Sequence, residues 1–337
     1  MLNLSTLLEK YLEENGRFLR PATIDLTKKG FEHLTSCIGN ILAPALEARH
    51  IRQWQCWFVD SGRSKTTANI FAKTTRPIFS WAVKEGLLET NPFKNCRLFR
   101  VPKHRIRVYE DWEVAAMLEA CPNVMWKALI ALARTSGLRR GEILNLNVSD
   151  IDFNAKLVYV SAKKETLQTW PWQPKDYEVR TLPLADVASR LLTELINELP
   201  EGQPYFFLTP KRYKTQLQKH LNGGLSHRQQ QTPSEHFTVP FNRIRRKAGV
   251  KTGTFHDLRR TWVTFLLRAG LPVHEVRDLA GHSDIKTTMT FYAGSCPDTL
   301  ERARDAVNRD FAASDPQSSA LPNCATPRKG HFSMFAV

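Results

Sequence analysis

A histidine and an arginine stand three positions apart, at His256 and Arg259, in one predicted helix over residues 254–269. Side chains at this spacing project from the same face of a helix. An imidazole and a guanidinium side by side can hold one phosphate, because the guanidinium can donate to two oxygens at once. The pair alone does not define a site, since ordinary surface helices carry the same spacing.

Two other segments carry polar residues of the same kinds. Upstream, the run Thr-Ser-Gly-Leu-Arg-Arg-Gly-Glu contains Arg139 and Glu142, and downstream, the run Leu-Ala-Gly-His ends in His282, ten residues before Tyr292. Glu142 lies three positions after Arg139, so on a helix it can pair with that guanidinium and fix its rotamer. An ordinary surface ion pair between the two is the alternative.

The three segments resemble the tyrosine recombinase family, also called the phage integrases. In that family one catalytic arginine lies in a G-L-R-x-x-E segment, a second lies in H-x-x-R, and L-G-H precedes the nucleophilic tyrosine by ten residues. The resemblance implies that the catalytic residues of this chain are Arg139, His256, Arg259, His282 and Tyr292. It also implies Glu142 as a supporting residue.

The family further has a catalytic lysine in a β-hairpin, commonly five residues before an arginine that opens an R-x-x-P-L strand. Arg180-Thr-Leu-Pro-Leu fits that strand and places Lys175 in the role. Lys164 and Lys163, at the other end of the hairpin loop, are the alternatives. The chain departs from the family pattern in its long hairpin loop, and in Gly294, where the family often has a histidine.

The reaction implied by the resemblance is transesterification at a DNA phosphodiester. Tyr292 would attack the phosphorus and form a 3′-phosphotyrosyl bond, while Arg139 and Arg259 hold the negative charge of the transition state. His282 would donate to a non-bridging oxygen, and His256 would accept the tyrosine proton or bond the phosphoryl group. The lysine would protonate the departing 5′ oxygen.

This chemistry needs neither a cofactor nor a metal, and the sequence contains neither a phosphate-binding G-x-x-x-x-G-K-[ST] loop nor a carboxylate cluster suited to paired Mg²⁺. The favoured function is a site-specific DNA recombinase or integrase, of the kind that mobile elements carry. A type IB topoisomerase-like enzyme that relaxes DNA is one alternative. An inactive DNA-binding relative is the other.

The first hundred residues are predicted to be helical. Leu4, Leu7 and Leu8 recur at helical spacing, with Ser5 as a candidate cap, and further helices are expected from Pro21, over residues 51–60, and from Ser64 to Gly86. The run over residues 78–92 resembles the end of the family's core-binding domain. The resemblance therefore implies an α-helical, SAM-like domain in this part of the chain.

From Asp111 the pattern changes to mixed α and β, as in the family's catalytic domain. Helices are expected over residues 111–120, 126–135, 184–199, 238–248, 254–269, 273–280 and 297–312, and strands over 157–161 and 179–183. The two strands can pair as a hairpin with a long loop. The polar stretch over residues 213–235 is interpreted as an exposed insertion.

The expected domain organisation has four parts. They are a helical core-binding domain over residues 1–100, a basic linker over 101–110, a catalytic domain over 111–313 and a disordered tail over 314–337. The resemblance implies a homotetramer on double-stranded DNA, with the helix over 297–312 docking on a neighbouring protomer. Packing of that helix within its own chain is the alternative.

Composition agrees with a DNA partner. The 337 residues include 48 Lys plus Arg against 33 Asp plus Glu, a net charge of +15, and 42% are hydrophobic, which excludes a mainly disordered or fibrous chain. Basic side chains that bind phosphates release condensed counterions. The sequence contains neither an 18-residue apolar run nor an export signal, so we expect a cytoplasmic protein without a membrane partner. Six scattered cysteines form no C-x-x-C pair and are expected to be reduced thiols.

Overall fold

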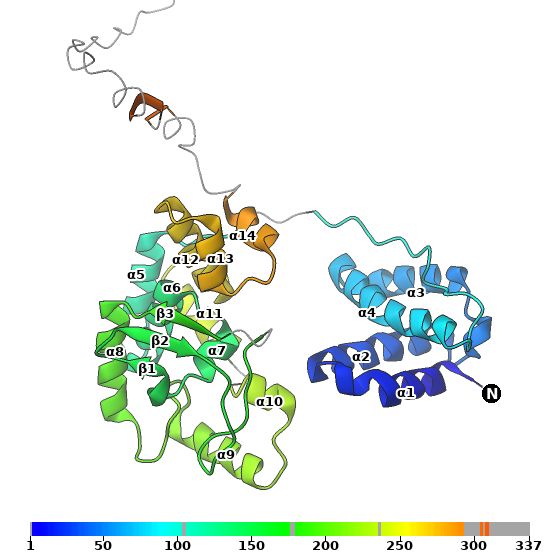
Figure 1. The fold of residues 1–337 in the computed structure, drawn as a ribbon, viewed down its shortest axis with the longest axis horizontal. Coiled ribbons are helices and arrows are strands. Elements are labelled where there is room, and N and C mark those ends of the chain that lie inside the picture. Colours follow the sequence, from blue (N-terminus) through cyan, green and yellow to red (C-terminus); the bar gives the residue numbers. More distant parts are fainter. Residues whose placement is uncertain are drawn as a thin grey trace, which may run out of the picture.

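The computed structural model describes residues 2–102, 106–175, 179–234 and 237–292, together with residues 304, 305 and 307–309. The predicted tail and most of the predicted last helix therefore lie outside the described residues. Within the described parts of the chain, the buried apolar residues form two large clusters and one small one. The predicted fold class, a helical part followed by a mixed α and β part, is confirmed (Figure 1). The domain boundaries themselves stay predictions.

Within residues 2–102, four α-helices enclose the first core (Figure 1). They are α1 (Leu4–Asn15), α2 (Pro21–Ile38), α3 (Ala48–Asp60) and α4 (Lys65–Lys84). Aromatic rings fill the centre, and the largest fully buried side chains are Phe31, Trp54, Phe58, Phe79 and Phe93. This core fixes the four helices relative to one another, because each contributes apolar residues to it.

The helix starts follow from capping and proline. Ser64 caps α4 by accepting a hydrogen bond from the backbone nitrogen of Thr67 at 3.1 Å, and Pro21 opens α2, where its missing N–H has no helical partner to lose. The prediction that Ser5 caps the first helix is wrong. Asn3 is the cap, and its side chain accepts from the nitrogen of Thr6 at 2.8 Å.

The second core is built on a central helix and a small sheet. The elements up to the sheet are α5 (Asp111–Glu119), α6 (Val124–Ser136), α7 (Arg140–Leu144), β1 (Ile151–Asp152), β2 (Leu157–Val160) and β3 (Arg180–Pro183). The buried helix α6 packs against helices on different sides, and the sheet is antiparallel in the order β1-β2-β3. The predicted hairpin is confirmed, with Val158 opposite Leu182, whereas β1 was not predicted.

The rest of the second core is helical. The elements are α8 (Asp186–Glu198), α9 (Pro210–Leu221), α10 (His227–Gln231), α11 (Thr238–Lys247), α12 (His256–Arg268), α13 (Val273–Ala280) and α14 (Ile285–Tyr292). Helices α8 and α12 pack against α6, and α14 packs against α12 and α13. The predicted helices in this region are confirmed to within a few residues at each end.

The end of the predicted linker belongs to the second core. Tyr109 is buried there, and its backbone nitrogen donates to Oγ1 of Thr261 on α12 at 2.8 Å. Its hydroxyl donates to the carbonyl oxygen of Thr254 at 3.0 Å, beside the start of α12. Two hydrogen bonds from one residue thus fix the entry of the chain into the second core.

The long hairpin loop packs into a third, smaller cluster. Trp170 stacks on Tyr205 with ring centroids 4.3 Å apart, and Tyr213 on α9 donates its hydroxyl to the carbonyl oxygens of Gln168 and Gly202, both at 3.1 Å. The interpretation of residues 213–235 as an exposed polar insertion is wrong in this respect. The stretch contains α9 and α10 and buries Tyr213, Gln216 and Leu225.

Two general expectations can be compared with the described residues. The four cysteines in them, Cys37, Cys56, Cys96 and Cys121, are free thiols. Among the described residues, no helix has the length and apolar character needed to span a bilayer.

Candidate functional site

Arg139 is placed by the turn that joins α6 to α7. Helix α6 ends at Gly137, whose left-handed backbone (φ 62°, ψ 19°) reverses the chain, and Arg139 is the N-cap residue of α7. Its backbone nitrogen donates to Oε2 of Glu142 at 2.7 Å, and its Nη1 donates to Oε1 of Glu142 at 3.0 Å. The expected contact between the two residues is therefore present, at the start of a short helix.

The Glu142 carboxylate is buried among guanidinium groups. It is 3% exposed and also accepts two hydrogen bonds from Arg180, one to each oxygen. Burial alone raises the pKa of a carboxyl, but the hydrogen bonds and charge of Arg180, with the charges of Arg139 and Arg259, outweigh it and hold the pKa of Glu142 below its ordinary value. Glu142 is therefore an ionised carboxylate at neutral pH.

Helix α12 supplies His256 and Arg259 from its first turn. Arg259 is 3% exposed, and its guanidinium donates from Nη1 to the carbonyl oxygen of Gly137 at 2.6 Å and from Nη2 to that of Ala280. The guanidinium thus joins the end of α6 to the end of α13. His256 is exposed at the start of the helix, one turn from Arg259.

His282 follows the left-handed residue that ends α13. Gly281 has φ 63° and ψ 51°, and its carbonyl oxygen accepts from Nη2 of Arg139. The His282 ring lies with Nδ1 2.9 Å from Oγ1 of Thr288 and stacks on Phe291 with the centroids 6.1 Å apart. Residues from α7, α12 and the α13–α14 turn are therefore brought together at one place.

Burial and the surrounding positive charge keep both histidines neutral at pH 7. Partial burial, followed by the charges of Arg259 and other nearby arginines, lowers the pKa of His256 to about 4. Partial burial and the charges of Arg259 and Arg139 lower the pKa of His282 to about 4 as well. A phosphate entering the site would therefore meet fixed guanidinium charges and two uncharged imidazoles.

Tyr292 is the last residue of α14. The residue before it, Phe291, is buried and stacks on the His282 ring, so the backbone that carries Tyr292 is docked beside His282. Of the six predicted catalytic residues, the structure thus brings Arg139 and Arg259 to the end of α13, where they bond the two carbonyls that precede His282. It places His256 one turn from Arg259, and it places the backbone of Tyr292 beside this group.

The three candidate lysines differ in their surroundings. Lys175 and Lys164 are exposed, and Lys175 directly precedes residues 176–178, which lie outside the described parts of the chain. Lys163 is half-buried, its ammonium pairs with the Asp150 carboxylate, and its backbone forms two hydrogen bonds with Trp172, at 2.7 and 3.2 Å. Lys163 and Glu142 also line the same small hollow. Among the three, Lys163 therefore has a described connection to the arginine cluster.

Arg180 and Thr288 also lie at this site, and neither was predicted from the sequence as a site residue. Arg180 is the first residue of β3, and burial alternates along that strand, with Arg180 on the buried face. A charged residue on the inward face of a strand requires a buried partner, and this is the signal that could have identified Arg180 from the sequence. Thr288 offered no comparable signal, because a threonine in a helix is ordinary.

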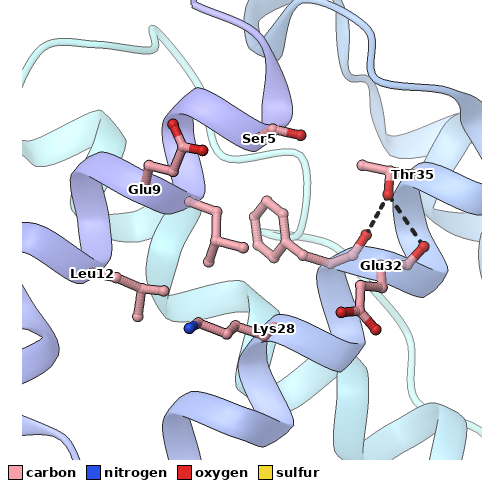
Figure 2. Close-up of a pocket in the computed structure, with 8 residues that line it drawn as sticks. Ser5, Glu9, Leu12, Lys28, Glu32 and Thr35 are labelled. Atoms are coloured by element: carbon pink, nitrogen blue, oxygen red, sulfur yellow. Dashed lines mark hydrogen bonds between the residues drawn. The ribbon is translucent and has the colours of Figure 1, made fainter.

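Several hollows lie in the described parts of the chain. One of about 470 Å³ adjoins His256 and is lined also by Arg140 and Asn242. Another, of about 360 Å³, lies in the first domain between α1 and α2, with Glu9, Lys28 and Glu32 around it (Figure 2). None of the candidate catalytic residues lines this second hollow. Across the described residues, no three His, Cys, Asp or Glu side chains gather as a metal site would need.

The sequence of this chain is similar to those of known recombinases. The tyrosine recombinase XerC-like protein of Caldanaerobacter subterraneus subsp. tengcongensis is 26% identical over 293 residues, covering 79% of this chain and 72% of the relative. The integrase of Salmonella phage P22 is 25% identical over 235 residues, covering 66% of this chain and 52% of that protein.

Solved structures show the same fold. The Tn1549 transposon integrase in complex with a circular intermediate DNA matches with a TM-score of 0.71 at 18% identity, over 92% of this chain and 100% of that one. The lambda integrase dimer bound to a COC′ core site matches with a TM-score of 0.66 at 17% identity, over 88% of this chain and 79% of that one. Residues 107–296, more than half of the sequence, match the phage integrase family. The chain therefore belongs to the phage integrase family, the tyrosine recombinases.

Proposed function

We propose that this chain is a site-specific DNA recombinase that cleaves and rejoins DNA through a 3′-phosphotyrosyl bond to Tyr292. The observation that carries the proposal is the meeting of Arg139, Arg259 and His282, which come from three separate segments, at the end of α13. Family membership and the DNA-bound relatives of the same fold support DNA as the substrate.

Arg139 and Arg259 would hold the scissile phosphate. A guanidinium presents its five N–H donors in a planar fork that can bind two phosphate oxygens at once. Both guanidiniums are already held in place, by bonds to protein carbonyls and, for Arg139, by the bond to Glu142. Negative charge grows on the non-bridging oxygens in the transition state. Donors fixed in advance stabilise that charge without reorganising, and losing one typically costs about 3 to 4 kcal/mol.

The two neutral histidines suit complementary tasks. A neutral imidazole has one donor nitrogen and one acceptor nitrogen. His282, with Nδ1 at Thr288, would donate from Nε2 to a phosphate oxygen. His256, whose pKa is lowered to about 4, is in the form that can accept a proton from Tyr292 or bond the phosphoryl group.

Tyr292 would act as the nucleophile. A free phenol has a pKa of about 10, so its proton must leave as attack occurs. The covalent bond that forms conserves the phosphodiester energy, and the free 5′ hydroxyl of a second strand can attack it and reseal the DNA. The leaving 5′ oxygen must be protonated as the first bond breaks.

We favour Lys163 as the residue that donates this proton to the leaving 5′ oxygen, although the sequence predicted Lys175. Its ion pair with Asp150 holds the ammonium in place, and its position on the extension of β2 is fixed by the backbone bonds to Trp172. Lys175 and Lys164 stay predictions, and substitution of each lysine separates the three.

Assembly as a homotetramer on DNA is a further part of the proposal, as is a cytoplasmic location. An apolar groove of about 570 Å³ lies between α5 and α12 and is lined by residues such as Val114, Leu118 and Leu266. It supports the assembly, because the segment over 297–312 of a neighbouring protomer carries apolar residues that could bind in such a groove. Removing residues 297–337 should then abolish recombination between two sites and leave single-strand cleavage intact. Loss of both would place the segment in the fold of its own chain.

The decisive experiment traps the covalent intermediate. A nicked substrate carrying the inverted repeats that flank the gene's own locus releases a short strand after cleavage, so the adduct cannot reseal. Wild-type protein and Tyr159→Phe, a control at an exposed strand position, should form the adduct, and Tyr292→Phe should form none. An adduct in Tyr292→Phe would refute the assignment of the nucleophile.

Two companion assays separate the other functions. Plasmid relaxation without exchange between two sites would favour a type IB topoisomerase-like enzyme. DNA binding without any adduct in the wild-type protein would favour an inactive relative. Binding should weaken steeply with salt, with a log–log slope of about 0.9 for each phosphate contact in B-DNA.

A further inference from the structure

Arg180 is a buried cation whose nitrogens are all engaged by the protein. Its side chain is 7% exposed. Nε donates to the carbonyl oxygen of Leu279 at 3.1 Å, Nη1 donates to Oε1 of Glu142 at 3.0 Å, and Nη2 donates to Oε2 at 2.6 Å. A guanidinium bound in this way has no free edge for a phosphate.

The Glu142 carboxylate is shared between two arginines. Oε1 accepts from Nη1 of Arg139 and of Arg180, and Oε2 accepts from the Arg139 backbone nitrogen and from Nη2 of Arg180. One negative charge thus faces two positive charges. Without Arg180, the charge of the Glu142 carboxylate would be balanced by Arg139 alone, because an unpaired buried charge is costly. With Arg180 present, Arg139 keeps positive charge for a further anion.

The end of α13 shows the same sharing. Three successive carbonyl oxygens, those of Leu279, Ala280 and Gly281, accept from Arg180, Arg259 and Arg139 respectively. The last carbonyls of a helix have no partner within the helix and carry its partial negative charge. Arginines are therefore favourable there. The next residue is His282, so the three bonds determine where its backbone lies.

We propose that Arg180 is a positioning residue of the recombination site: through Glu142 it orients Arg139, and through Leu279 it fixes the turn that carries His282. It does not contact the phosphate. The inference rests on the proposed function, since the step that it supports is DNA cleavage.

The test uses the full chain and the nicked substrate described above. Cleavage is measured in a single turnover at saturating protein, and DNA affinity is measured separately by mobility shift. Arg180→Gln should cleave about 10- to 100-fold more slowly, the range seen when residues that orient active groups are removed, with DNA affinity within about twofold of the wild type. Arg190→Gln, at an exposed position on α8, is the matched control and should change neither.

Two further variants separate positioning from a general loss of structure. Arg180→Lys keeps the charge but cannot make the paired bonds to Glu142, so its cleavage rate should lie between those of the wild type and Arg180→Gln. If Arg180 acts through Glu142, the double variant Arg180→Gln/Glu142→Gln should be slowed much less than the product of the two single effects. Thermal unfolding of each variant shows whether it is folded at the assay temperature.

The outcomes are distinct. If the wild-type protein cleaves and Arg180→Gln cleaves at the same rate, the positioning role of Arg180 is overturned and the proposed function stands. The same holds if Arg180→Gln loses DNA affinity in proportion to its loss of cleavage. If Arg180→Gln does not fold, a wild-type rate in folded Arg180→Lys overturns it equally. Failure of the wild-type protein to form any adduct overturns the proposed function instead.

Discussion

The imidazole of His282 is held by the hydroxyl of Thr288, with Nδ1 2.9 Å from Oγ1. Thr288 is fully buried, so the hydroxyl stays at this place and does not exchange its partner for water. A phosphate oxygen can only accept, so Nε2 must carry the proton when it contacts DNA, and Nδ1 must then accept from Thr288. In the tautomer that the proposed donor needs, the threonine donates its hydroxyl to Nδ1 and holds the ring in place.

Replacing Thr288 should therefore slow cleavage without changing DNA affinity. Thr288→Val removes the hydroxyl at nearly constant volume, and the loss of one such hydrogen bond, about 1 kcal/mol, corresponds to about a fivefold lower rate. Single-turnover cleavage of the nicked substrate measures the effect. Thr288→Ser keeps the hydroxyl and should cleave close to the wild-type rate. Equal rates in the valine and wild-type proteins would remove Thr288 from the site.

The residue that donates the proton can be identified by changing the leaving group of the DNA substrate. Lys163→Met should lower cleavage of ordinary DNA strongly, while Lys175→Met and Lys164→Met should have small effects. A substrate with sulfur in place of the bridging 5′ oxygen leaves as a thiolate, which needs no proton, so it should restore the cleavage rate of the variant that lacks the acid. Rescue of Lys175→Met in place of Lys163→Met would return the role to the originally predicted lysine.

The identity and order of the candidate site residues could be predicted from the sequence. The contacts between them could be predicted only where the two residues are close together in the sequence. Arg139 and Glu142 are three residues apart, so their contact followed from helical spacing. The contact of Arg180 with Glu142 spans 38 residues and depends on how β3 packs against α7 and α13. No local pattern contains that information.

The region around α9 was misjudged for a related reason. Its helix is so polar that composition indicated an exposed insertion, yet Tyr213 and Gln216 are buried, and Tyr213 donates its hydroxyl to the hairpin loop. Trp170 in that loop stacks on Tyr205, far along the chain. The apolar partners of the helix thus lie in another segment, and the periodicity of one segment cannot show them.

Acid should weaken the fold through His256. Its pKa is about 4 in the folded protein, against the ordinary histidine value of 6.5, so the unfolded chain binds the proton first as the pH falls. The associated stability is complete above pH 6.5 and is lost on going down towards pH 4. Because the ring is only partly buried and water screens its charge, the loss at pH 5 should be only about 1 kcal/mol.

Urea unfolding at pH 7.5 and pH 5 measures this loss. Between pH 7.5 and pH 5, the free energy of unfolding should decrease in both proteins. The decrease should be smaller by about 1 kcal/mol in His256→Gln than in the wild type, since glutamine cannot titrate. His274→Gln, at an exposed position on α13, serves as the control and should follow the wild-type curve. Identical acid losses in His256→Gln and the wild type would contradict the electrostatic account of the site.

Gly137 links the fold to the site, because its carbonyl oxygen accepts from Arg259 and its backbone turns the chain towards Arg139. It has φ 62°, and a Cβ atom there would lie 2.0 Å from Cε3 of Trp262, which is 3% exposed and enclosed by the core. Gly137→Ala therefore combines left-handed strain of about 1 kcal/mol with overpacking of about 1 to 3 kcal/mol.

Gly249→Ala is the matched comparison, since its φ of 73° is similar and a Cβ atom there meets nothing within 4 Å. It should lose only the strain energy, about 1 kcal/mol, in urea unfolding. Gly137→Ala should lose at least twice as much and should also cleave more slowly under conditions where it remains folded, because the shifted turn moves the acceptor of Arg259. Equal losses of stability in the two variants would mean that Trp262 can move aside. An unchanged cleavage rate in folded Gly137→Ala would mean that the turn does not hold the arginine in place.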